Sequence, residues 1–176
     1  AQGGCPMDEW RPILLWHITR DEFLVRDFLC GWLFGEYDDG AYRVRADDLH
    51  EYLRTVGSRG GQTEHSWTDA TLHRVAAGLL KIAADFGLLS GSVVKEFTSY
   101  YLPERSLLYL LHAMLEQEDR SPRRVIDAED WRMYLMRSSD LENELLRLHQ
   151  FQLVDYQAAG SLVQLSMPAT SALDYA

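Results

Sequence analysis

The sequence predicts a mainly helical α+β fold in which one short order of elements is used twice. Apolar residues recur at helical spacing along most of the chain. In addition, the segments "RVRADDLHEYL" and "RVIDAEDWRMYL", which start at Arg43 and Arg124, resemble each other. Each begins Arg-Val, passes through acidic residues and then opens an apolar pattern of helical period. The 176 residues are enough for one ordinary domain or two small ones.

The first elements are helical. Residues 13–34 carry apolar residues at helical spacing, and the capping-box pair Thr19 and Glu22 predicts a helix start near Arg20. Residues 35–40 contain Gly and Asp residues typical of a turn.

A short strand and two further helices follow. The alternating residues 42–45 predict the strand, and Asp47 predicts an N-cap for a helix over 48–56. The glycine-rich residues 57–62 predict a flexible break.

The longest predicted helix begins after either Ser66 or Thr68, both good N-cap residues, and ends at Gly87, which favours a left-handed C-cap. Its apolar stripe consists of Leu72, Val75, Ala76, Leu79, Ile82 and Ala83. The alternating residues 91–102 then predict a half-buried strand that ends at Pro103.

The second half repeats this order. It predicts a helix at 104–119, a turn with a short extended piece at 120–127, a helix at 128–136, a helix capped by Ser139 with Glu142, and a hairpin at 154–168 around Gly160. Helix, strand, helix, helix and hairpin is the order of a winged helix, which is a helix-turn-helix with a β-wing.

We therefore expect a mainly α fold with short β-hairpins, built as two tandem winged-helix-like (helix-turn-helix) domains. Residues 1–103 would hold an N-terminal helical segment and the first domain, and residues 104–176 the second. The alternative is one all-α bundle with a hairpin.

The net charge of −10 comes from 17 basic and 27 acidic residues, and residues 1–90 hold half of it. This weighs against strong nonspecific nucleic-acid binding, but it leaves room for a local basic face. Of the basic residues, 15 are Arg and two are Lys. Arg suits bidentate contacts to phosphate or guanine, although a GC-rich genome would produce the same bias.

The chain has the features of a cytoplasmic protein. The N-terminal residues lack the basic-then-apolar pattern of a signal peptide, and no apolar run is long enough to span a bilayer. We therefore expect no membrane partner. The two cysteines, Cys5 and Cys30, predict free thiols rather than a disulfide framework.

The segment "SWTDATLHRVAAGLLKIAADFGLL" resembles a part of the BrxA family of BREX phage-defence proteins, in which a Trp-Ser/Thr-x-x-Thr opening leads into a long helix ending in Gly-Leu-Leu. The matching positions are Trp67, Thr68, Thr71, Gly87, Leu88 and Leu89. Two later segments, "DWRMYLM" and "LLRLHQFQLVDYQAAGSLVQL", are similar to the C-terminal end of that family, so the resemblance extends over about 20–168. It implies a small, mostly helical, non-enzymatic bacterial protein linked to double-stranded DNA within a multi-protein defence system.

Helix N-termini, short hydroxyls and arginines are the groups that suit phosphate. On this basis the predicted DNA-binding residues are Arg43, Arg45, Arg59, Ser66, Thr68, Thr71, Arg74, Arg120, Arg123, Arg124 and Arg137. The alternative is a purely structural role, in which the hydroxyls are helix caps and the arginines form surface ion pairs. The densest basic run, 120–137, has five arginines against three acids.

No catalytic residue, metal site or cofactor is expected. The sequence has no GxGxxG, Walker, HExxH or GxSxG motif, and the six histidines show no convincing ligand spacing. Two functions remain. One is a non-enzymatic DNA-binding protein of a BREX-type system. The other is a winged-helix protein-interaction scaffold that contacts other defence proteins and not DNA.

Overall fold

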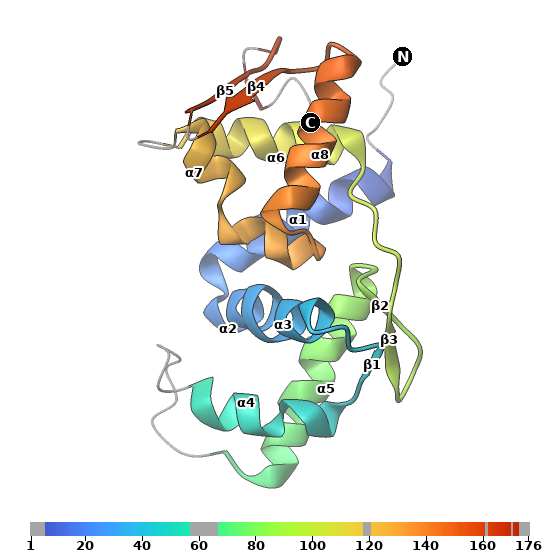
Figure 1. Ribbon diagram of the computed structural model, residues 1–176. Coiled ribbons are helices and arrows are strands. Elements are labelled where there is room, and N and C mark those ends of the chain that lie inside the picture. The colour runs from blue at the N-terminus through green and yellow to red at the C-terminus, as the bar shows by residue number, and fades with distance from the viewer. Residues whose placement is uncertain (1–5, 57–66, 118–120, 161, 170, 173–176) are drawn as a thin grey trace. The chain divides into compact units, whose positions relative to one another are not determined.

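The computed structural model describes residues 6–56, 67–117, 121–160, 162–169 and 171–172. It is mainly helical with two small antiparallel sheets, which confirms the predicted class (Figure 1). None of the helices in these ranges combines the length and the apolar content needed to cross a membrane.

The chain forms two compact units. Unit 2 comprises residues 15–100, and unit 1 comprises residues 1–14 together with 101–176. The predicted division into domains 1–103 and 104–176 stays a prediction, since these units are defined by packing alone.

Unit 2 begins within a helix. Helix α1 spans Met7–Asp21, and it is followed by α2 (Phe23–Asp27), a π-helix η1 (Phe28–Leu33) and α3 (Phe34–Asp38). The helix start predicted near Arg20 is therefore wrong. The buried Thr19 hydroxyl donates to the Trp16 carbonyl at 2.9 Å inside α1, and Glu22 precedes α2 without a capping bond from its side chain.

The next elements of unit 2 are β1 (Arg43–Val44), a 3₁₀ helix η2 (Ala46–Leu49), α4 (His50–Thr55), α5 (Asp69–Asp85), β2 (Leu89–Ser90) and β3 (Lys95–Phe97). The predicted Asp47 cap is wrong. The N-cap of η2 is Arg45, whose amide donates to Asp48 Oδ2 at 2.7 Å. The glycine-rich break predicted at 57–62 lies outside the described residues.

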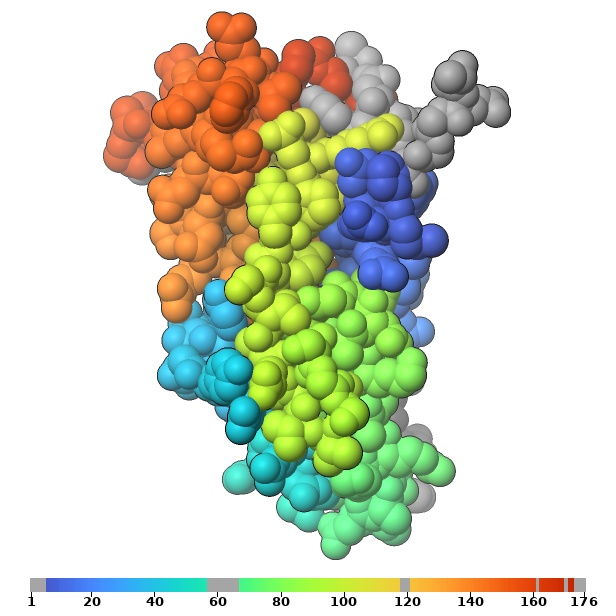
Figure 2. All heavy atoms as spheres, turned by 90° about the vertical axis from the view of Figure 1, so that its right-hand side faces the viewer, coloured from blue at the N-terminus to red at the C-terminus, as the bar shows by residue number. Residues whose placement is uncertain are grey.

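The three strands of unit 2 form one antiparallel sheet in the order β1-β3-β2. Val44 pairs with Lys95 and Leu89 pairs with Phe97. Figure 2 shows the β1 region in cyan beside the yellow-green β3 region. The single strand predicted over 91–102 is thus shorter than expected, because its first residues form the turn of a β2–β3 hairpin.

Unit 1 contains α6 (Glu104–Leu115), α7 (Pro122–Ile126), a 3₁₀ helix η4 (Glu129–Tyr134), α8 (Ser138–Gln150) and the hairpin strands β4 (Asp155–Ala159) and β5 (Leu162–Ser166). The hairpin matches the prediction. Gly160 lies in its turn with φ +61°.

Two local predictions in unit 1 are wrong. The segment predicted as extended forms α7, because the Ser121 hydroxyl accepts from the Arg124 amide and Pro122 suits the first helical turn. Helix α8 begins before the predicted Ser139 cap, and at its start the Arg137 amide donates to Asp140 Oδ2 at 2.8 Å. Unit 1 therefore has a helix where unit 2 has strand β1, so the order of elements is not repeated completely.

The repeated sequence segments nevertheless have similar structures. Both aligned alanines, Ala46 and Ala128, lead into a 3₁₀ helix. The aligned tyrosines are both buried: the Tyr52 hydroxyl donates to Asp27 at 2.8 Å, and the Tyr134 hydroxyl donates to the Pro12 carbonyl at 2.8 Å. The similarity thus reflects matching core positions.

Two glycines of unit 2 give a test of this fold. Gly91 has φ +91°, and a Cβ there would lie 2.5 Å from the Val94 carbonyl oxygen, whereas Gly78 in α5 has open space around it. We expect Gly91→Ala to lower the free energy of unfolding by at least about 1–2 kcal/mol. Gly78→Ala should raise it by about 1 kcal/mol, since alanine favours helix.

Urea denaturation followed by far-UV circular dichroism measures both effects in the full chain. Equal effects of the two substitutions would contradict the hairpin turn described here.

Candidate nucleic-acid interface

Helix α5 has one buried face and one exposed face. The buried row consists of Leu72, Ala76, Leu79, Leu80 and Ala83, and Gly87 ends the helix with φ +83°, as predicted. The exposed side carries His73, Arg74, Ala77, Gly78 and Lys81. Its middle is therefore formed by two small residues, which allow close approach of a ligand to the helix backbone.

The N-terminus of α5 is capped by Thr68. The Thr68 hydroxyl accepts from the Thr71 amide at 3.3 Å and lies 3.0 Å from the Thr71 hydroxyl. Thr68 therefore serves as the helix cap, as the capping interpretation expects. Ser66, the other predicted cap, lies outside the described residues.

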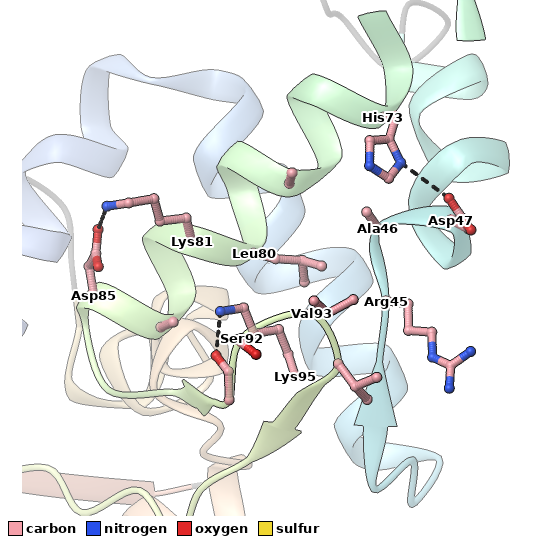
Figure 3. A pocket seen from close by; sticks show the side chains of 14 residues that line it. Arg45, Ala46, Asp47, His73, Leu80, Lys81, Asp85, Ser92, Val93 and Lys95 are labelled. Atoms are coloured by element: carbon pink, nitrogen blue, oxygen red, sulfur yellow. Dashed lines mark hydrogen bonds and ion pairs between the residues drawn. The ribbon is translucent and has the colours of Figure 1, made fainter. Parts of the chain in front are cut away.

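A groove of about 960 Å³ lies between α5 and the β2–β3 hairpin, with η2 at one end (Figure 3). Leu80 from α5 and Val93 from the hairpin turn are among the residues that line it. The only two lysines of the chain, Lys81 and Lys95, both line this groove.

Most cations of the groove have partners. Lys81 Nζ lies 2.7 Å from Asp85 Oδ2, and Lys95 Nζ donates to the Gly91 carbonyl at 2.7 Å. Arg45 is different: its side chain extends away from the lining residues drawn in Figure 3, and within the described ranges no acid pairs with its guanidinium. It is the cation of the groove most available to an anion.

The other predicted arginines of unit 2 also differ in whether an acid pairs with them. Arg43 Nε lies 2.9 Å from Glu96 Oε1, across the β1–β3 pair. Arg74 on α5 is exposed, and none of the acids that the structure describes pairs with it. Arg54 of α4, which is not among the predicted residues, is paired with Asp69 at the start of α5 at 2.9 Å. Arg59 lies outside the described residues.

Two arginines of the basic run in unit 1, Arg123 and Arg132, lie beside acids. Arg123 contacts Asp127 at 2.7 Å and Glu142 at 3.4 Å, and Arg132 contacts Glu129 at 3.2 Å. Arg124 and Arg137 are exposed and each has a partner. Arg120 lies outside the described residues.

Arg147 of α8 belongs to the same pattern. Its guanidinium lies 2.8 Å from Glu144 and 3.1 Å from Glu104. The hydrogen bond to Glu144 raises the pKa of Arg147, partial burial opposes this, and the bond to Glu104 adds to it. The arginine thus ties α8 to α6.

One cluster of side chains was not predicted from the sequence. Asp47, His50 and His73 bring a carboxylate and two imidazoles within 4.8 Å of one another. The spacing Asp47-x-x-His50 was a usable local signal. His73, in contrast, is 26 residues away from Asp47 and joins the pair only because α5 packs on η2 and α4.

The groove, helices α4 and α5 and the β2–β3 hairpin all lie in a segment that matches a known family. The BrxA family model matches residues 2–113. The chain belongs to the BrxA family. Family membership associates this BrxA-family protein with the BREX phage-defence systems. Searches of curated proteins and of solved structures found no match.

The family match confirms the resemblance and changes its extent. It begins before the predicted residue 20 and ends near the C-terminus of α6. The similarity expected for the segments after residue 113 stays a prediction.

The capping role of Thr68 is testable. Thr68→Ala should lower the free energy of unfolding by about 1 kcal/mol, since an N-cap oxygen is lost, and Thr68→Ser should recover most of it. Chemical denaturation of the BrxA-family chain measures this difference. Unchanged stability in Thr68→Ala would contradict the capping role and leave the hydroxyl free for a ligand.

Proposed function

We propose that this BrxA-family protein is a non-enzymatic component of a BREX-type system that contacts double-stranded DNA through unit 2. In this proposal unit 2 is a winged helix, with α5 as the reading helix and the β2–β3 hairpin as the wing. The order α4, α5, β2, β3 after strand β1 supports it, as does the pairing of the hairpin with β1.

The observation that carries the proposal is the exposed surface of α5 beside the groove. An α-helix fits the major groove of DNA, and Ala77 and Gly78 leave the helix backbone close to the surface. Arg45 at the groove and Arg74 on the helix are exposed cations without an acidic partner among the described residues. Such arginines reach phosphates or guanine edges at little cost, because no existing ion pair has to break.

The charge of unit 2 limits how strong this contact is. Residues 15–100 hold 9 basic and 13 acidic residues. Contact with about two to four phosphates would give a log-log salt slope of about −2 to −4, which is shallow for a DNA-binding protein. We therefore expect weak, salt-sensitive binding that other components of the system reinforce.

A second candidate function is supported by unit 1. It holds 8 basic and 14 acidic residues, and the ion pairs of Arg123, Arg132 and Arg147 occupy their guanidinium groups. Near the end of α8, Leu146 is 50% and Phe151 is 66% exposed. Acidic surface with exposed apolar side chains suits a protein partner, so the alternative is a scaffold for other defence proteins without direct DNA contact.

A binding titration separates these functions. The probe is a duplex of about 30 base pairs, titrated at about 50 mM and about 200 mM salt. We expect binding at the lower salt that weakens at least about tenfold in Arg45→Glu/Arg74→Glu, because two phosphate contacts become repulsive.

The matched variant is Arg123→Glu/Arg124→Glu, which makes the same charge change in unit 1. It should weaken binding less, since Arg123 already pairs with two acids. An equal loss in both variants would show that total charge, not the α5 surface, governs binding. Absence of binding at low salt would rule out direct DNA contact and support the scaffold function.

A further inference from the structure

Three side chains of unit 2 converge at one end of the groove. Asp47 comes from η2, His50 from the start of α4 and His73 from α5. Asp47 Oδ1 lies 3.2 Å from His73 Nδ1 and 3.7 Å from His50 Nε2, and the two imidazole rings meet edge to face at 84°. Figure 3 shows His73 and Asp47 pointing toward each other.

The local fold explains this convergence. Residues three apart in a 3₁₀ turn lie on the same side, so η2 and the start of α4 align Asp47 with His50. The intervening Leu49 is fully buried and fixes the turn. Leu72 is likewise buried and fixes the rotation of α5 about its axis. Its neighbour His73 therefore points toward Asp47.

An ordinary ion pair does not account for all three groups. His73 is close enough to Asp47 for a hydrogen bond, but His50 Nε2 at 3.7 Å is not. That nitrogen is buried and has no hydrogen-bond partner among the residues that the structure describes. A buried polar atom left unsatisfied requires an explanation, and it faces the carboxylate that His73 also reaches.

We propose that Asp47, His50 and His73 form a binding site for a divalent transition-metal cation of the Zn²⁺ class. Zinc binds imidazole nitrogen and carboxylate oxygen at about 2.0–2.2 Å, so two ligand atoms of a tetrahedral site lie about 3.3 Å apart. The two separations from Asp47 Oδ1 are 3.2 Å and 3.7 Å, close to that value. The metal would also satisfy His50 Nε2.

The ligand set selects the class of cation. Calcium and magnesium take oxygen ligands, whereas two imidazoles and one carboxylate suit zinc and its first-row neighbours. Three protein ligands leave a fourth position for water. Asp48 and Glu51 flank the ligands along the chain and add negative charge that favours a cation.

A metal here would join η2 and α4 to α5. Helices α4 and α5 are the two helices of the proposed helix-turn-helix. The bound cation would hold the two helices together and so stabilise unit 2. The metal site follows from the ligand geometry alone and does not depend on DNA contact.

The test is a Zn²⁺ titration of the tag-free full chain after removal of metal with a chelator, in the absence of DNA. Calorimetry should show one Zn²⁺ per chain, and Co²⁺ should give the visible absorption of a tetrahedral site. We expect His50→Ala and His73→Ala each to weaken binding at least about tenfold. Zn²⁺ should raise the unfolding temperature of the unaltered chain and not of these variants.

His149→Ala is the matched control, because His149 Nδ1 lies 3.6 Å from Asp155 in an Asp–His pair that gains no third ligand among the described residues. It should bind Zn²⁺ like the unaltered chain. Unfolding temperatures in chelator show whether each variant folds, and Asp47→Asn gives a further variant of similar shape. An unaltered chain that binds no Zn²⁺, or binding that survives His50→Ala and His73→Ala together, would overturn the proposal. Neither result bears on the DNA titration.

Discussion

The packing of one face of α5 is the constraint on which the rest of unit 2 depends. Leu72, Ala76, Leu79 and Ala83 are nearly inaccessible to solvent, so this face fixes the rotation of the helix about its axis. Once it is fixed, the opposite face must present His73, Ala77 and Lys81 to the groove. The groove, the Asp-His-His cluster and the exposed small residues are therefore consequences of a single amphipathic pattern.

The net charge of the chain does not tell which of its surfaces suit an anion, because acidic and basic side chains pair locally. In unit 1, Arg123 and Arg132 of the basic run lie beside acids of the same or the neighbouring helix. Exposed pairs of this kind contribute little stability, but they occupy the guanidinium groups. In unit 2, Arg45 beside the groove and Arg74 on α5 have no acidic partner within the described part of the chain. Local geometry, not composition, separates the two surfaces.

Sequence patterns predicted the elements with strong local signals. The Gly87 end of α5 and the hairpin around Gly160 were predicted correctly, and Thr68 was one of the two residues predicted as the cap of α5. Each of these features depends on residues close in sequence. The helix start predicted near Arg20 was wrong because the side chain of Thr19 bonds within α1 instead of capping α2.

Features that depend on packing could not be predicted in the same way. Helix α7 was read as extended, since its five residues are too short to show a period. The Asp47–His73 contact joins residues on separate elements, and no local sequence pattern around either residue predicts it. The pairing of Arg123 with Glu142 on α8 likewise needs the packing of two helices.

The sheet of unit 2 has a consequence for how the protein behaves at high concentration. Its two outer strands, β1 and β2, are each only two residues long. A sheet edge recruits strands of other molecules through its unpaired backbone groups, and an edge this short offers very few of them. The hairpin can thus remain exposed for a ligand without becoming a template for edge-to-edge aggregation.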